Sequence, residues 1–171
     1  MLNTYEHDDA GKLIRSVREV VPNIASLIAR ARSEDVDVVY VNDNYGAWDA
    51  GPGDIVERAL AGPHPDLIEP IVPPGDVTAF VLKARHTIFY QTPLEYLLRQ
   101  TLGVERLVLT GQVTEQCILY SALDAYVRHF QVVVPSDAVA AIHPGLHDAA
   151  LEMMRVNMDA DLTPTKEIRL S

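Results

Sequence analysis

The 171-residue chain has a single cysteine, no long apolar run and few basic residues. One cysteine excludes an internal disulfide framework and a cysteine-rich zinc module. No apolar run reaches the roughly 18 residues that a spanning helix needs, so we expect no membrane association. The 14 lysines and arginines against 24 aspartates and glutamates give a net charge of −10. This balance argues against a nucleic-acid partner, because binding to phosphates depends on a basic surface.

Targeting and cofactor motifs are absent as well. Residues 1–9 are polar and acidic, with no basic stretch followed by an apolar one, so a signal peptide is not expected. The sequence contains no GxGxxG, P-loop or GxSxG motif, which leaves nucleotide cofactors and α/β-hydrolase chemistry without support. Its six histidines form no HExxH or Asp-x-His unit, so no metal and no cofactor are expected. These features favour a single cytoplasmic domain over residues 1–171.

Apolar, valine-rich runs alternate with helical patterns along the chain. Runs typical of buried strands cover residues 36–41, 77–82, 106–110 and 131–134, with a weaker candidate at 167–170. Apolar periodicity predicts helices over residues 11–20, 22–33 and 92–102, from a Thr114 cap onward, and over 144–157. Apolar strands separated by helices predict an α/β fold with a doubly wound, mainly parallel sheet.

Residues 42–76 lie between two of these strands and are rich in glycine and proline. We expect a long irregular loop here, and a loop of this length in a compact domain is usually functional. It follows the carboxyl end of a strand, where open α/β sheets place their ligands.

Cys117 and Lys83 occupy positions that indicate catalytic chemistry. Cys117 lies in the first turn of a predicted helix that follows a strand, where exposed amides and the helix dipole favour a thiolate. A lone cysteine is as often a small buried apolar residue. Lys83 follows a strand, from which it can stabilise a thiolate or an oxyanion on a neighbouring turn. A solvated loop lysine is the alternative.

Four stretches of the chain resemble, in order, the motifs of a known superfamily. They are residues 36–48 (VDVVYVNDNYGAW), 83–90 (KARHTIFY), 107–125 (LVLTGQVTEQCILYSALDA) and 131–137 (QVVVPSD). The third stretch contains G-x-x-T-x-x-C, a quite specific pattern. Together the four resemble the isochorismatase-like cysteine hydrolase superfamily over nearly the whole chain.

The resemblance implies a three-layer α/β/α fold and an acyl-transfer mechanism. Cys117 would be the nucleophile and Lys83 its supporting cation, while the backbone amides of Val113 and Cys117 would form the oxyanion hole. The resemblance further implies a cis peptide bond between Gln112 and Val113 and a homodimer or homotetramer that acts on a small molecule.

The start of the chain departs from the superfamily pattern. Members begin with a central strand that ends in the third catalytic residue, an aspartate, and this position would precede Met1. Asp8 and Asp9 lie past it and are poor substitutes. We therefore expect Met1 to be internal to a longer chain, and residues 1–171 alone to be poorly folded and inactive. A short homologue with a remodelled sheet is the alternative.

The resemblance also narrows the reaction. Superfamily members that cleave the vinyl ether of isochorismate generally lack the cysteine, so Cys117 favours hydrolysis of a C–N bond through a thioester intermediate. Nicotinamidases carry Asp-x-His where this chain has Asp43, Asn44 and Tyr45, so a metal site is not expected. An inactive binding or structural protein and an isochorismate-type hydrolase are the alternatives.

Further side chains are candidates for the walls of a substrate pocket, although each taken singly is more often structural. They are Asn44, Tyr45, Trp48, Arg85, His86, Gln116 and Tyr120.

Overall fold

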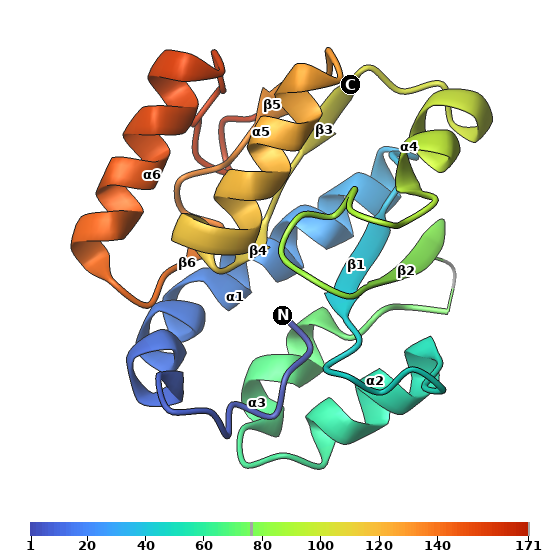
Figure 1. Cartoon of the computed structure of the whole chain (residues 1–171), viewed down its shortest axis with the longest axis vertical. Coiled ribbons are helices and arrows are strands. Elements are labelled where there is room, and N and C mark those ends of the chain that lie inside the picture. Colours follow the sequence, from blue (N-terminus) through green and yellow to red (C-terminus); the bar gives the residue numbers. More distant parts are fainter. Residues whose placement is uncertain (76, 171) are drawn as a thin grey trace.

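Short parallel strands form the centre of the fold in the computed structural model, which describes residues 1–75 and 77–170 (Figure 1). In chain order they are β1 (Val39–Asp43), β2 (Ala79–Lys83), β3 (Arg106–Val108), β4 (Gly111–Gln112), β5 (Gln131–Val133) and β6 (Val139–Ala140). β1 pairs with β2, β3 with β5, and β4 with β6, each pair in parallel. The four stronger strand predictions are confirmed with shifted ends, and β4 and β6 were not predicted.

Helices cover both faces of these strands. They are α1 (Ala10–Ser33), α2 (Pro52–Leu60), α3 (Pro65–Ile68), η1 (Glu69–Ile71), α4 (Leu94–Tyr96), η2 (Leu97–Thr101), η3 (Thr114–Ile118), α5 (Leu119–Val127) and α6 (Pro144–Asn157). Phe80 and Leu82 of β2 pack with α1, α2 and α3, whereas Val81 packs with α4, α5 and α6. Because side chains alternate across a strand, this places helices on opposite faces and confirms the α/β fold.

The sheet is divided into two halves. β1 and β2 form one half, and β3 with β5, continued by β4 and β6, forms the other. Among the described residues, no backbone ladder joins β1 to β3. A cavity of about 600 Å³ lies between them and is lined by residues of both strands.

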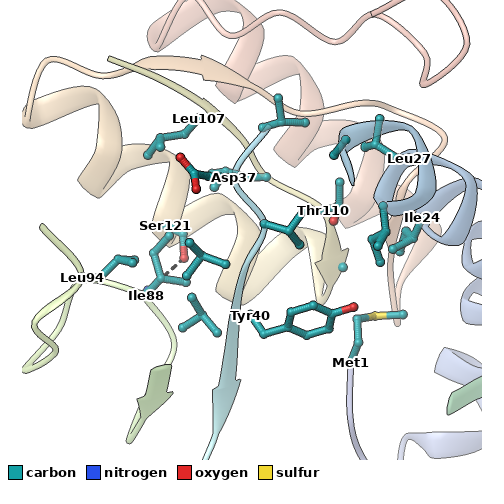
Figure 2. Close-up of a pocket in the computed structure, with 18 of the residues that line it drawn as sticks. Met1, Ile24, Leu27, Asp37, Tyr40, Ile88, Leu94, Leu107, Thr110 and Ser121 are labelled. Atoms are coloured by element: carbon teal, nitrogen blue, oxygen red, sulfur yellow. Dashed lines mark hydrogen bonds between the residues drawn. The ribbon is translucent and has the colours of Figure 1, made fainter. Parts of the chain in front are cut away.

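The walls of this cavity come from both helical layers as well as from the strands. Figure 2 shows Ile24 and Leu27 of α1, Tyr40 of β1, Leu107 of β3 and Ser121 of α5 around it. The walls are therefore mostly apolar, and the cavity runs along the facing edges of the two halves.

α1 is one helix where the sequence predicts two, over residues 11–20 and 22–33. Pro22 lies inside it at an exposed position, and an internal proline costs about 3 kcal/mol because it removes a hydrogen bond. The buried stripe of the helix continues past the proline, and the burial of these apolar side chains offsets the cost. Its members are Ala10, Leu13, Val17, Val20, Val21, Ile24, Leu27 and Ala31.

The prediction of an irregular loop over residues 42–76 is wrong for residues 52–60 and 65–71, and Asp76 itself lies outside the described residues. α2, α3 and η1 lie in this stretch, separated by short turns. Pro52 and Pro65 each open a helix, at the position where the missing N–H costs nothing. The Asp54 carboxylate also accepts a hydrogen bond from the Gly51 amide at 2.7 Å.

Two further predictions are wrong. Residues 167–170 form no strand. A turn over residues 165–167 runs into them, with the Glu167 and Ile168 amides donating to the Pro164 carbonyl, and Ile168 packs against Leu27 and Val133. Thr114 does not cap its helix, because Val113 holds the cap position with an extended backbone and Thr114 is fully buried. Within the described residues, no helix is both long and apolar enough to cross a membrane.

Candidate active site

Asp43 and Lys83 end neighbouring strands and face each other in register. The Lys83 ammonium lies 2.7 Å from an Asp43 carboxylate oxygen. The Lys83 side chain is only 4% exposed, while that of Asp43 is 30% exposed. The alternative of a solvated loop lysine is therefore wrong: Lys83 is a buried cation with a carboxylate partner.

Cys117 approaches this ion pair from the other half of the sheet. It lies in η3, which follows β4 directly, and its sulfur is 3.8 Å from Lys83 Nζ. The thiol is half-buried and, like Lys83, lines the cavity between the halves. The structure thus brings together the two residues on which the sequence-based hypothesis rests, across an interface that no ladder closes.

The turn before Cys117 has an unusual backbone. Gly111 adopts a φ of +120°, which L side chains rarely reach. The peptide bond between Gln112 and Val113 is cis. The Val113 carbonyl then accepts hydrogen bonds from the amides of Gln116 and Ile118, so the first turn of η3 is wide and closes on Val113. The amides of Val113 and Cys117 remain the predicted oxyanion donors.

His86 lies on a third side of the thiol. Its Nδ1 is 4.0 Å from Cys117 Sγ, and its ring packs edge-on against Tyr120 with centroids 5.3 Å apart. The sequence named His86 only as one of several pocket candidates. The structure places its ring against the Cys117 sulfur.

The first residues of the chain are held at the same edge by Asn42, which is buried. The Asn42 side chain accepts hydrogen bonds from the Met1 amine at 3.2 Å and the Leu2 amide at 3.1 Å, and donates one to the Leu2 carbonyl at 3.0 Å. Burial lowers the pKa of the Met1 amine to about 6, with smaller effects from Asp43, Lys83 and Cys117.

Tyr5 and Tyr45 fasten this segment further. The Tyr5 hydroxyl lies 3.1 Å from the Gln112 side-chain oxygen, and the Tyr45 hydroxyl donates to the Leu2 carbonyl at 3.0 Å. Burial raises the pKa of both phenols, so both remain protonated donors at neutral pH. The segment therefore joins β1 to the turn that precedes Cys117.

Four other pocket candidates either make structural contacts or are exposed. Asn44 is buried and caps a local turn, with its side chain accepting from the Gly46 amide. Tyr45 holds the Leu2 carbonyl, Trp48 is 80% exposed, and Arg85 is exposed. None of these four lines the cavity that contains Cys117 and Lys83.

Gln116 and Tyr120 lie on either side of Cys117 along η3 and α5. Gln116 is half-buried, and Tyr120 is exposed on one side and packed against His86 on the other. These two and His86 are the pocket candidates nearest to the thiol in the fold.

Asp43 and Asn42 are functional candidates that the sequence reasoning missed. The signal for Asp43 was present: two predicted neighbouring strands each end close to a charged residue, and carboxyl ends of parallel strands meet at one edge of a sheet. For Asn42 the sequence carried no comparable signal, because its partner is the backbone of residues 1 and 2.

The missing Asp-x-His unit predicts that the protein needs no metal ion, and removal of metal tests this prediction. In the described part of the chain, no group of three His, Cys, Asp or Glu side chains could hold a metal ion, and Tyr45 stands where a metal-binding histidine would be needed. We predict that dialysis against EDTA leaves turnover unchanged. Loss of activity that zinc or iron restores would contradict this prediction.

Comparisons with known proteins agree with this geometry. The family description "Isochorismatase domain" matches residues 1–167. The chain is 33% identical over 168 residues to the uncharacterized isochorismatase family protein YaaI of Bacillus subtilis, covering 98% of this chain and 92% of the relative. It is 27% identical to a protein of Arabidopsis thaliana named "Probable inactive nicotinamidase", covering 96% and 88%.

A solved structure is similar as well. N-carbamoylsarcosine amidase from Thermoplasma acidophilum superposes with a TM-score of 0.70 at 28% identity, covering 91% of this chain and 87% of that one. A family match over nearly all residues, a relative above 30% identity and a shared fold around Cys117 point the same way. The chain belongs to the isochorismatase family of the cysteine hydrolase superfamily.

Proposed function

We propose that this protein is a cysteine hydrolase that cleaves the C–N bond of a small amide-type molecule through a thioester intermediate. The observation that carries the proposal is the position of the Cys117 sulfur, 3.8 Å from the buried Lys83 ammonium and within the first helical turn after a strand. A nearby cation and helix amides both stabilise negative charge on sulfur and on the oxyanion that forms next.

Each residue has a distinct task in this mechanism. The Cys117 thiolate attacks the carbonyl carbon, and the amides of Val113 and Cys117 donate to the developing oxyanion. Lys83 stabilises the thiolate, and Asp43 fixes the Lys83 ammonium at 2.7 Å. Collapse of the tetrahedral intermediate breaks the C–N bond as the leaving nitrogen takes up a proton from solvent, and water then hydrolyses the thioester to release the acid product and restore the thiol.

The position of the site favours a small substrate. Lys83 ends β2, and Cys117 lies 3.8 Å from it at the carboxyl edge of the parallel strands, where open α/β sheets bind small molecules. A relative of known structure is named for cleavage of a carbamoyl compound, which makes carbamoyl and ureido compounds the first class to test.

An inactive binding protein is the second candidate. It is favoured by the relative from Arabidopsis thaliana that is named "Probable inactive nicotinamidase". The isochorismate-type reaction has less support, because such enzymes generally lack the cysteine.

Cys117 labelling and turnover separate these candidates. We expect iodoacetamide to alkylate Cys117 at near-neutral pH faster than a free thiol, because the ammonium and helix amides favour the thiolate. A panel of small amides, carbamoyl and ureido compounds should be hydrolysed by the full-length wild-type protein and not by its Cys117→Ser variant. Intact-mass spectrometry gives a clear readout, since the chain has one cysteine.

Two outcomes would contradict the proposal. Labelling that appears only after denaturation would identify Cys117 as an inert core residue. Fast labelling with no turnover of any compound in the panel would favour the inactive binding protein.

A further inference from the structure

We propose that a second copy of this chain covers the outer face of α5 and α6 and so completes one wall of the candidate active site. The two copies are related by a two-fold axis across the helices. Each helix then lies antiparallel on its own counterpart, α5 on α5 and α6 on α6. The interface forms whichever small molecule the site accepts.

Exposed apolar side chains gather on these two neighbouring helices. Among the described residues, eleven large apolar side chains are exposed, and seven of them belong to α5 or α6. The two helices contact each other and lie side by side on one face of the sheet (Figure 1). An apolar patch of this kind on a folded chain marks an interaction surface. The α5–α6 face is defined here by Tyr120, Leu123, Val127, Leu146, Met153 and Val156, which are between 43% and 59% exposed.

On α5 the exposed apolar side chains form one stripe. Tyr120, Leu123 and Val127 follow at i, i+3 and i+7, the spacing of neighbours along one side of a helix. The opposite side of the helix contains Ala122 and Ala125, which are fully buried. α5 is therefore apolar on two sides, and the fold of one chain covers only one of them.

α6 has a matching stripe whose spacing is the same from either end. Leu146, Met153 and Val156 lie at i, i+7 and i+10, and the small exposed side chain of Ala149 lies between the first two. In an antiparallel pair, Leu146 of one copy faces Val156 of the other, and Ala149 faces Met153. A small side chain opposite a long one allows two helices to interdigitate. The stripe is thus complementary to itself.

The charge of the chain favours a second copy as the occupant of this face. At a net charge of −10, two copies repel each other across most of their surfaces. On α5, Asp124 is neutralised by Arg128 at 2.8 Å. On α6, Glu152 is neutralised by Arg155 at 2.7 Å, which leaves Asp148 as the carboxylate of these two fully described helices that has no ion pair. A basic partner would be drawn to the acidic faces, whereas this nearly neutral one lets identical acidic chains meet.

The α5–α6 face reaches the candidate active site at one end. Gln116 lies four residues before Tyr120, on the same side of the helix and next to Cys117. The Tyr120 ring packs edge-on against His86, whose Nδ1 is 4.0 Å from the Cys117 sulfur. A second copy seated on Tyr120 covers the outer side of this wall and restricts access to the thiol from that direction.

The mass of the full-length protein in solution gives the first test. We expect Leu123→Glu and Met153→Glu each to halve the mass of the wild-type assembly in light scattering at about 10 μM. Each variant brings a carboxylate and its symmetry mate into an apolar interface, and this should weaken association roughly 100-fold or more. Both positions are exposed, so far-UV circular dichroism should match that of wild type.

Trp48→Glu is the matched control for added charge. Trp48 is the most exposed of the large apolar side chains, at 80%, and lies outside the two helices. This variant should keep the wild-type mass. A monomeric wild-type protein at about 50 μM, or the wild-type mass in either of the other two variants, would overturn the inference.

Salt dependence identifies the kind of contact. Because salt screens the repulsion between two acidic chains, the dimer should tighten several-fold between about 0.05 and 0.5 M NaCl. An interface built on ion pairs would weaken over the same range, and that result would also overturn the inference.

Disulfide cross-linking tests the antiparallel arrangement. Cys117→Ser removes the single cysteine, and Ala149→Cys and Met153→Cys are then made separately in that background. After subunit exchange and mild oxidation, the mixture should give far more linked dimer than either protein alone, because these two positions face each other across the axis. Equal yields from the mixture and from the separate proteins would contradict the proposed interface.

Discussion

An extended apolar segment added ahead of Met1 is expected to raise the free energy of unfolding by a few kcal/mol. β1 and β3 present facing edges that no ladder closes, and the cavity between them has mostly apolar walls. Met1 lies at the carboxyl end of these edges, held by Asn42. A segment joined to Met1 can therefore run along the cavity in parallel with both strands.

The size of the effect follows from burial. About six residues span the cavity at the rise of a strand. Each fully buried side chain contributes about 1.5–3 kcal/mol, offset in part by about 1–2 kcal/mol for each backbone residue that is ordered. Because helices cover both faces, every position of the segment should be apolar.

Urea unfolding and light scattering check this prediction. Residues 1–171 alone should associate through their open edges, and the extended protein should not. The control extension has the same length with proline at two central positions, where the missing N–H prevents pairing. Equal unfolding midpoints for both extensions and the unextended chain would contradict the prediction.

Removal of one partner from the Lys83–Asp43 ion pair is expected to give strongly unequal losses of stability. Asp43→Asn leaves the 4% exposed ammonium without a carboxylate, and an uncompensated buried charge costs about 3–5 kcal/mol. Lys83→Met leaves Asp43, which at 30% exposure can recover solvation. We expect this second variant to lose about 1–2 kcal/mol.

The double variant completes the comparison. With both charges removed, stability should recover toward wild type, because no buried charge is left unpaired. The coupling energy from a double-mutant cycle in urea unfolding measures the interaction. Additive losses would show that the 2.7 Å contact carries no energy of its own. Cys117 alkylation should slow in every variant that lacks Lys83.

The sequence was sufficient for features that depend on local pattern. The valine-rich runs identified β1, β2, β3 and β5, and the helix after β4 placed Cys117 at the right edge of the sheet. It failed where burial outweighs a local rule. The apolar stripe of α1 continues through Pro22, and prolines read as loop signals in residues 42–76 instead open α2 and α3.

In the candidate site, too, some residues could be predicted from the sequence and others could not. The sequence predicted Lys83 and Cys117 because each follows a strand and because Cys117 lies in a specific motif. The contact of His86 with the thiol instead depends on a positive φ and on packing against Tyr120. No pattern in one sequence encodes either of these. Trp48 looked like a pocket wall because it follows β1, but it is 80% exposed.

The division of the sheet has a consequence for how the active site keeps its shape. Lys83 belongs to one half and Cys117 to the other, so no hydrogen-bonded ladder fixes the distance between ammonium and thiol. α1 packs against α3 and η1 on one side and against β4 and β6 on the other. α1 therefore bridges the two halves on the far face of the sheet, as residues 1–5 do at the carboxyl edge, and substitutions in α1 are expected to change the distance between Lys83 and Cys117 without touching either residue.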